Sequence, residues 1–85
     1  MQRDTIEKEI LRIFAELFEI ESPGLDENLA EVYEFDSIDA IELLRELETL
    51  LGTELTRPEQ KEAMEIRTIN QIIDYVENLA GKRNI

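Results

Sequence analysis

The chain has 85 residues, of which 42% are hydrophobic, and its 21 acidic and 9 basic side chains leave a net charge of −12. A charge of this size repels nucleic acid and anionic membrane surfaces and attracts basic proteins, so we expect protein partners, no nucleic acid and no membrane insertion. The chain has no Cys and no His, which removes thiolate chemistry, the usual zinc sites and the side chain best suited to proton transfer near neutral pH. We therefore predict no metal site and no catalytic residue.

This length predicts one domain over residues 1–85, with little room for an enclosed active site. The first residues lack the basic start and the apolar run of a secretion signal, and no apolar stretch reaches membrane-spanning length. The expected protein is a cytoplasmic monomer without enzymatic activity.

The N-terminal part of the chain is predicted to contain one helix and one long loop. Asp4 and Glu7 have the spacing of a capping box, and apolar residues then recur at intervals of three and four, so a helix is predicted from Thr5 to about Phe18. The proline and glycine that follow cannot continue a helix, and a loop is predicted up to about Asp36. We expect four apolar side chains to pack this loop against the fold: Leu29, Val32, Tyr33 and Phe35.

The central part of the chain is predicted to form a long helix and then a short one. Leucine and isoleucine recur with helical spacing from Asp36 to Leu51, and Gly52 is a natural stop. Thr56 and Glu59 bracket a proline with the spacing of a capping box. They predict a short helix that ends near residue 64.

A closing helix is predicted to begin at Thr68, which has capping-box spacing with Gln71, and to end at Gly81. No segment alternates between polar and apolar residues over a convincing length, so no strand is predicted. The predicted fold class is all-α, a small four-helix bundle with three longer helices and one short third helix.

Ser37 is the residue most suggestive of function, because it lies between Asp36 and Asp39 where the long loop meets a helix. A phosphate attached to this serine is expected to lie beside unpaired backbone N–H groups and the positive end of the helix dipole. No histidine is available to activate the hydroxyl, so Ser37 is predicted to be the substrate of another enzyme rather than a nucleophilic catalyst. In the alternative interpretation, Asp36 or Ser37 only caps the helix and Asp39 completes the box, and the two roles are compatible.

Residues 36–43 read DSIDAIEL, which resembles the Asp-Ser-Leu-Asp signature of acyl carrier proteins and related thiolation domains. The resemblance extends along nearly the whole chain, through its helix order, length and acidity. It implies an acyl carrier protein-like fold and a phosphopantetheine group that a phosphopantetheinyl transferase (holo-carrier synthase) moves from coenzyme A to Ser37. It further implies that the protein carries acyl groups as thioesters to enzymes of fatty-acid, lipid or polyketide biosynthesis.

Three residues depart from the pattern of that family. Glu34 stands where members commonly have glycine, and Val32 stands where many have aspartate, so the loop before Ser37 is expected to take a different path. Arg45 stands where many fatty-acid carriers have an apolar contact residue. An aminoacyl, D-alanyl or peptidyl carrier therefore remains an alternative to an acyl carrier.

Acidic residues follow one side of the predicted second helix at intervals of three and four. They form either a solvated face or a surface on which acyl-loading and acyl-transfer enzymes dock through basic patches, and carriers of the resembled family dock through this helix. The predicted docking residues are Asp36, Asp39, Glu42, Arg45, Glu46 and Glu48.

The resemblance also implies a cleft between the helices that shelters an acyl chain. Its predicted lining is Ile41, Leu44, Leu47, Ile72 and Val76, which would otherwise be ordinary core residues. A function of another class, an acidic inhibitor or interaction protein that occupies basic clefts through charge, would not need Ser37.

Overall fold

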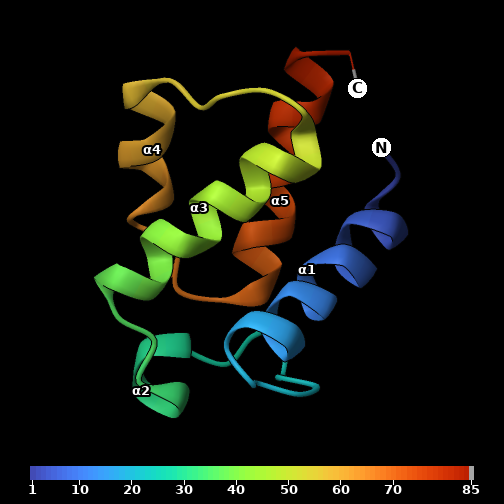
Figure 1. Cartoon of the computed structure of the whole chain (residues 1–85). Coiled ribbons are helices and arrows are strands. Elements are labelled where there is room, and N and C mark those ends of the chain that lie inside the picture. Colours follow the sequence, from blue (N-terminus) through green and yellow to red (C-terminus); the bar gives the residue numbers. More distant parts are fainter. Residues whose placement is uncertain (85) are drawn as a thin grey trace.

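The computed structural model describes residues 1–84 and contains five α-helices (Figure 1). In chain order these are α1 (Arg3–Leu17), α2 (Leu29–Tyr33), α3 (Ser37–Leu51), α4 (Arg57–Ala63) and α5 (Ile69–Lys82). No strand occurs in the described part of the chain, so the all-α prediction is confirmed. The four predicted helices form the bundle, and α2 is an additional short helix in the predicted loop.

The core lies between the apolar faces of α1, α3 and α5. In Figure 1, α3 crosses in front of α5, α1 packs along α5, and α4 lies on the far side of α3 from α1. The side chains with no solvent exposure come mainly from α1 and α5: Ile6, Ile10, Phe14, Ile69, Ile72, Ile73 and Val76. Leu43, Leu47 and Leu51 of α3 are also buried. Burial of these stripes is the main stabilising term, because isolated helices of this length are marginal in water.

Helix α1 begins earlier than predicted, and the predicted capping box of Asp4 and Glu7 is wrong. The N-cap is Gln2, whose side chain makes no capping hydrogen bond. Arg3 instead pairs with Asp74 at 2.7 Å and Glu77 at 3.3 Å, both on α5. These contacts hold the first turn of α1 against α5, and a tertiary contact thus decides this boundary.

The predicted loop is largely packed against the bundle by hydrogen bonds. The backbone N–H of Leu29 donates to the carbonyl of Arg67 at 2.9 Å, and the N–H of Asn70 donates to the carbonyl of Leu25 at 2.9 Å. The Asn70 side chain also donates to the Asp26 carboxylate at 2.7 Å. Leu29 is buried, whereas Tyr33 and Phe35 are half-buried. Val32 is 51% exposed, so the expectation that it anchors the loop is wrong.

The other predicted caps are confirmed, with one exception. Helices α3, α4 and α5 each start at a capping box, in which two residues three apart each accept, through the side chain, the backbone N–H of the other. The pairs are Asp36 and Asp39, Thr56 and Glu59, and Thr68 and Gln71. Gly52 ends α3 with φ at 71°, a left-handed conformation that favours glycine. Helix α5 continues through Gly81 to Lys82, so Gly81 is not its C-cap.

Helix α4 is joined to the end of α5 by a charged and hydrogen-bonded contact. The Arg83 guanidinium donates to both carboxylate oxygens of Glu59, at 2.6 Å and 3.0 Å. The hydroxyl of Tyr75 donates to the Glu59 carbonyl at 2.6 Å, and burial raises the pKa of Tyr75 to about 12. The bonds from Arg83 and from the Thr56 backbone lower the pKa of Glu59 from 4.5 to about 2.

Replacing Arg83 with glutamine is expected to destabilise the protein in a pH-dependent way. Because the folded pKa of Glu59 is depressed, its contribution is fully present above about pH 4.5 and is lost as the pH falls toward 2. The melting temperature of Arg83→Gln should therefore lie below that of the wild type at neutral pH, and the gap should narrow through this window. Lys82→Gln, which removes the same charge from an exposed neighbour, is the control. A gap that stays constant from pH 6 to 2 would contradict the role given to Glu59.

No helix within residues 1–84 combines the length and the apolar character needed to cross a membrane.

Candidate functional site

Ser37 is the first residue of α3, and its side chain is exposed. Helix α3 starts there because Asp36 caps it: one carboxylate oxygen of Asp36 accepts from the backbone N–H groups of Ile38 and Asp39, each at 3.0 Å. The Asp39 carboxylate in turn accepts from the Asp36 N–H at 3.1 Å. The capping interpretation is thus confirmed for the two aspartates, and it does not involve the serine hydroxyl.

The hydroxyl of Ser37 is available for modification. Within residues 1–84, no hydrogen-bond partner of this hydroxyl is found. The expected unpaired N–H groups beside it are largely missing, however, because those of Ile38 and Asp39 already donate to Asp36. The start of α3 therefore presents an exposed hydroxyl rather than a ready anion site.

The segment before Ser37 turns sharply at Glu34. This residue ends α2 with φ at 57° and ψ at 32°, a left-handed conformation in which a Cβ atom is unfavourable. The position at which the resembled family commonly has glycine thus retains a conformation suited to glycine. Phe35 follows, and its ring packs on Phe14 and Phe18 with centroid distances of 5.5 and 5.2 Å.

Replacing Glu34 with glycine is expected to raise the free energy of unfolding by about 0.5 kcal/mol. Glycine relieves the strain of the left-handed conformation, and this gain is partly offset because glycine has greater conformational entropy in the unfolded chain. Chemical denaturation measures this change. Glu34→Ala removes the same carboxylate but keeps the Cβ, so it is the matched control. Equal stability of the two variants would show that backbone strain is not the cause.

Ser37 lies on the rim of a pocket of about 290 Å³ between α3, α4 and the α4–α5 connection. Of the predicted cleft residues, Leu44, Leu47 and Ile72 line it. Ile41 is 49% exposed on the outer face of α3, and Val76 is fully buried away from the lining. The structure therefore does not bring all five together.

Several lining residues were not predicted from the sequence. Ala40 on α3 and Ala63 on α4 lie on opposite elements of the pocket, together with Met64 and Arg67. Small side chains within otherwise bulky apolar stripes are the signal that could have indicated this space, because they leave room between packed helices.

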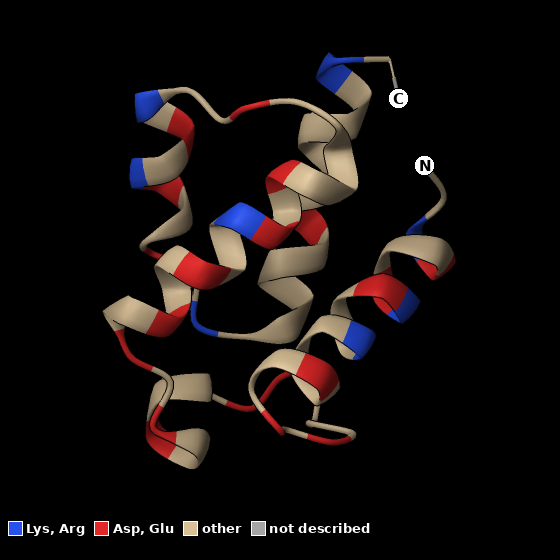
Figure 2. Ribbon diagram, in the orientation of Figure 1, with Lys and Arg blue, Asp and Glu red and all other residues tan. Residues whose placement is uncertain are grey.

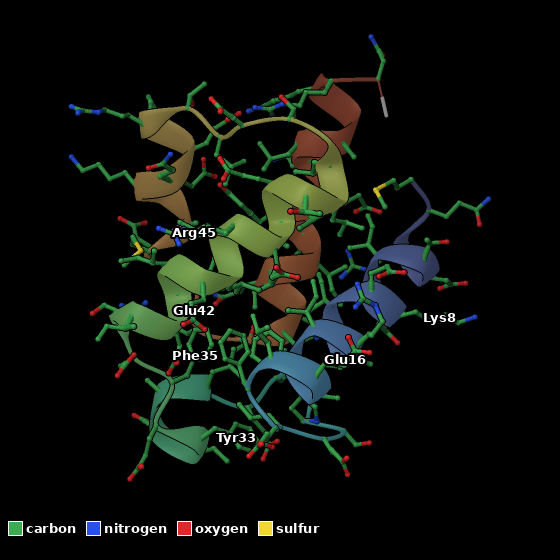
Figure 3. All side chains as sticks on the ribbon, in the orientation of Figure 1. Lys8, Glu16, Tyr33, Phe35, Glu42 and Arg45 are labelled. Atoms are coloured by element: carbon green, nitrogen blue, oxygen red, sulfur yellow. The ribbon has the colours of Figure 1, made fainter. Side chains whose placement is uncertain are left out.

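Acidic positions along α3 flank one basic position, as the ribbon colours in Figure 2 show. Asp36 and Glu42 are exposed, whereas Asp39 and Glu46 are half-buried. Arg45 is exposed and makes no ion pair within the described residues, and Figure 3 shows it projecting from the same helix as Glu42.

The remaining predicted docking residue is engaged within the fold. The Glu48 carboxylate accepts from the backbone N–H of Leu55 at 2.8 Å and so holds the α3–α4 connection. Two isoleucines at helical spacing from Arg45, Ile38 and Ile41, are 67% and 49% exposed. They add an apolar surface next to Ser37 that the acidic pattern alone did not reveal.

The residues around Ser37 fit a phosphopantetheine group. The exposed hydroxyl could provide the oxygen of a phosphodiester, and the adjoining pocket is lined mainly by aliphatic side chains. Within residues 1–84, no group of three or more acidic side chains is arranged to hold a metal ion.

Comparison with known proteins agrees with this geometry. A family model described as "Phosphopantetheine attachment site" matches residues 8–76, which span most of α1, all of α2 to α4 and the first part of α5. A search of curated proteins found no significant match. The chain therefore belongs to the phosphopantetheine attachment site family, whose domains carry a covalently attached phosphopantetheine group.

Proposed function

We propose that Ser37 carries the phosphopantetheine arm and that the protein transports acyl groups as thioesters on it. The observation that carries this proposal is the placement of Ser37: an exposed hydroxyl with no partner in the described fold, at the start of α3 and on the rim of an apolar pocket. A phosphopantetheinyl transferase supplies the arm from coenzyme A, and acyl-loading and acyl-transfer enzymes then act on its terminal thiol.

The pocket favours acyl cargo over aminoacyl or peptidyl cargo. Its walls include Leu43, Leu44, Leu47 and Ile72. An amino group or a peptide bond would lose its hydrogen bonds to water among such side chains, which is costly without a partner. An aliphatic chain gains free energy by leaving water there. The cargo supported best is thus a fatty acyl or similar hydrocarbon chain.

The outer face of α3 is the proposed docking surface. Asp36, Asp39, Glu42 and Glu46 would face basic patches, while Ile38 and Ile41 would enter an apolar recess of the partner. Electrostatic complementarity of this kind sets orientation and association rate more than affinity. Arg45 would require an acidic or hydrogen-bond-accepting group opposite it, which distinguishes suitable partners from those that offer only basic side chains.

Arg45 is the observation that favours a second candidate function, a D-alanyl, aminoacyl or peptidyl carrier. Its exposed guanidinium on the docking face would suit partners other than those of fatty-acid synthesis. The two candidates differ in the cargo that the pocket protects.

The test starts from the complete chain, coenzyme A and a broad-specificity phosphopantetheinyl transferase. We expect the intact mass to rise by one phosphopantetheinyl group. In parallel reactions, the apo protein is loaded from octanoyl-coenzyme A and from alanyl-coenzyme A. Cleavage of each protein-bound thioester by hydroxylamine is compared with cleavage of the corresponding free thioester. We expect the protein to slow cleavage of the octanoyl thioester more than cleavage of the alanyl thioester. No mass gain would contradict a carrier, and equal protection of the two thioesters would contradict the acyl preference.

A further inference from the structure

The phosphopantetheine arm brings a negative charge to an acidic place. Its phosphodiester would lie on Ser37, which has a carboxylate on each side at Asp36 and Asp39, in a chain of net charge −12. Like charges at such short separations repel each other unless a cation or hydrogen-bond donors compensate. Some group of the protein should therefore stabilise the phosphodiester.

The N-terminus of α3 is poorly suited to that task. Its N–H groups at Ile38 and Asp39 donate to the Asp36 carboxylate, and the N–H of Asp36 donates to Asp39. These donors are no longer available to an anion, and the two carboxylates offset the positive end of the helix dipole. The compensating charge must come from a side chain.

Arg67 is the basic side chain that lines the same pocket as Ser37, and Asp36 is the other charged residue of that lining. It lies in the connection between α4 and α5, which passes beside the first turns of α3 (Figure 1). Within residues 1–84, Arg67 makes no ion pair, unlike Arg3, Arg12 and Arg83.

Both the backbone and the guanidinium of Arg67 are held in place. Its N–H donates to the Gln71 side chain at 2.6 Å, and its carbonyl accepts from Leu29 at 2.9 Å. One terminal nitrogen, Nη1, donates to the carbonyls of Met64 and Ile66 at 3.0 and 3.1 Å. Nε and Nη2 have no partner in the described residues and remain available as donors. An arginine fixed at one end loses less conformational freedom when it binds an anion.

We propose that Arg67 binds the phosphodiester of the arm on Ser37 and so holds the start of the arm at the rim of the apolar pocket. The planar guanidinium presents paired donors that match phosphate oxygens. Arg67 is in this respect a positioning residue, since it touches neither the thiol nor the cargo. The inference rests on the proposed attachment of the arm to Ser37.

The test is a thermodynamic cycle between the arm and the side chain. Melting temperatures are measured for the apo and phosphopantetheinylated forms of the wild type, Arg67→Gln and Arg57→Gln at low ionic strength. The substitution Arg67→Gln also deletes the bonds from Nη1 to the two carbonyls. Because that loss is the same in the apo and modified forms, comparing each modified protein with its own apo form cancels it. Attachment of the arm should lower the melting temperature of Arg67→Gln by about 4 °C more than that of the wild type. This excess should vanish in 1 M salt.

Arg57→Gln is the matched control, because Arg57 is exposed at the start of α4 and does not line the pocket. It should behave as the wild type does. An equal response of all three proteins, or an equal loss in both variants, would overturn the role of Arg67. As a second readout, the Nε–H resonance of Arg67 should shift on attachment of the arm, and an unchanged resonance would also overturn it.

The two proposals fail differently in this experiment. If the wild type gains no phosphopantetheinyl mass, the proposed function falls and the inference falls with it. If the mass increases but the arm changes the melting temperatures of Arg67→Gln and the wild type equally, the arm is still attached and only the role of Arg67 is wrong.

Discussion

Replacing Ser37 with alanine is expected to abolish attachment of phosphopantetheine completely while leaving the fold intact. The hydroxyl oxygen is the atom that would form the phosphodiester, so no arm can be attached without it. The side chain is exposed and has no hydrogen-bond partner in the described structure. Alanine is also a good helix former at the start of α3, so the free energy of unfolding should change by no more than about 0.5 kcal/mol.

Intact mass after incubation with coenzyme A and the transferase measures the effect, and thermal unfolding checks the fold. Ser22→Ala is the matched control, because Ser22 and Ser37 are the two serines of the chain and both are exposed. Ser22→Ala should gain the arm as the wild type does. A mass gain in Ser37→Ala would place the arm on another residue. A biological activity that survives in Ser37→Ala would instead favour an acidic interaction protein, because a carrier without its arm is inactive.

Replacing Phe14 with alanine is expected to cost about 3–5 kcal/mol of folding free energy, the largest effect on stability considered. Phe14 has no solvent exposure, and its ring lies 5.2 Å from that of Phe18 and 5.5 Å from that of Phe35. Truncation leaves a cavity where α1 meets the segment that precedes α3. A domain of this size has a total stability of roughly 4–13 kcal/mol, so the variant should be close to unfolding.

Urea denaturation followed by circular dichroism measures this loss. Phe14→Leu keeps most of the volume and should remain folded with a cost of about 1–1.5 kcal/mol, so a measurable variant exists even if the alanine variant does not fold. Phe18→Leu, at a half-buried ring, should cost less than Phe14→Leu. The reverse order would mean that the aromatic cluster is not centred on Phe14.

The Phe14 substitution also bears on the site. Phe35 lines the pocket next to Ser37 and is held from behind by Phe14 and Phe18. Loss of that support should loosen Phe35, and thus one wall of the pocket. In Phe14→Leu, an octanoyl thioester should accordingly be cleaved by hydroxylamine faster than in the wild type.

The sequence indicated the family, and the serine at which we propose the arm is attached, because those signals are local and continuous. The DSIDAIEL run contains both the cap of α3 and the serine that the cap leaves exposed. The sequence analysis placed Glu48 on the docking surface, but its carboxylate binds the backbone N–H of Leu55. That contact does not follow from residue type or spacing. Glu34, which stands at a position where the resembled family commonly has glycine, occupies a left-handed turn.

The sequence alone determined the starts of α3, α4 and α5. Each depends on a capping box between residues three apart, whose hydrogen bonds join only local residues. It also determined the strongly negative charge and the absence of histidine and cysteine.

Only the tertiary structure decided the start of α1, the packing of the loop and the shape of the pocket. Arg3 meets Asp74, and Leu29 meets Arg67, across long stretches of chain. The pocket exists because Ala40 and Ala63 come from different helices, and it excludes Ile41 because α3 turns that side chain to solvent. Contacts between distant residues depend on how whole helices pack, and no local spacing encodes that arrangement.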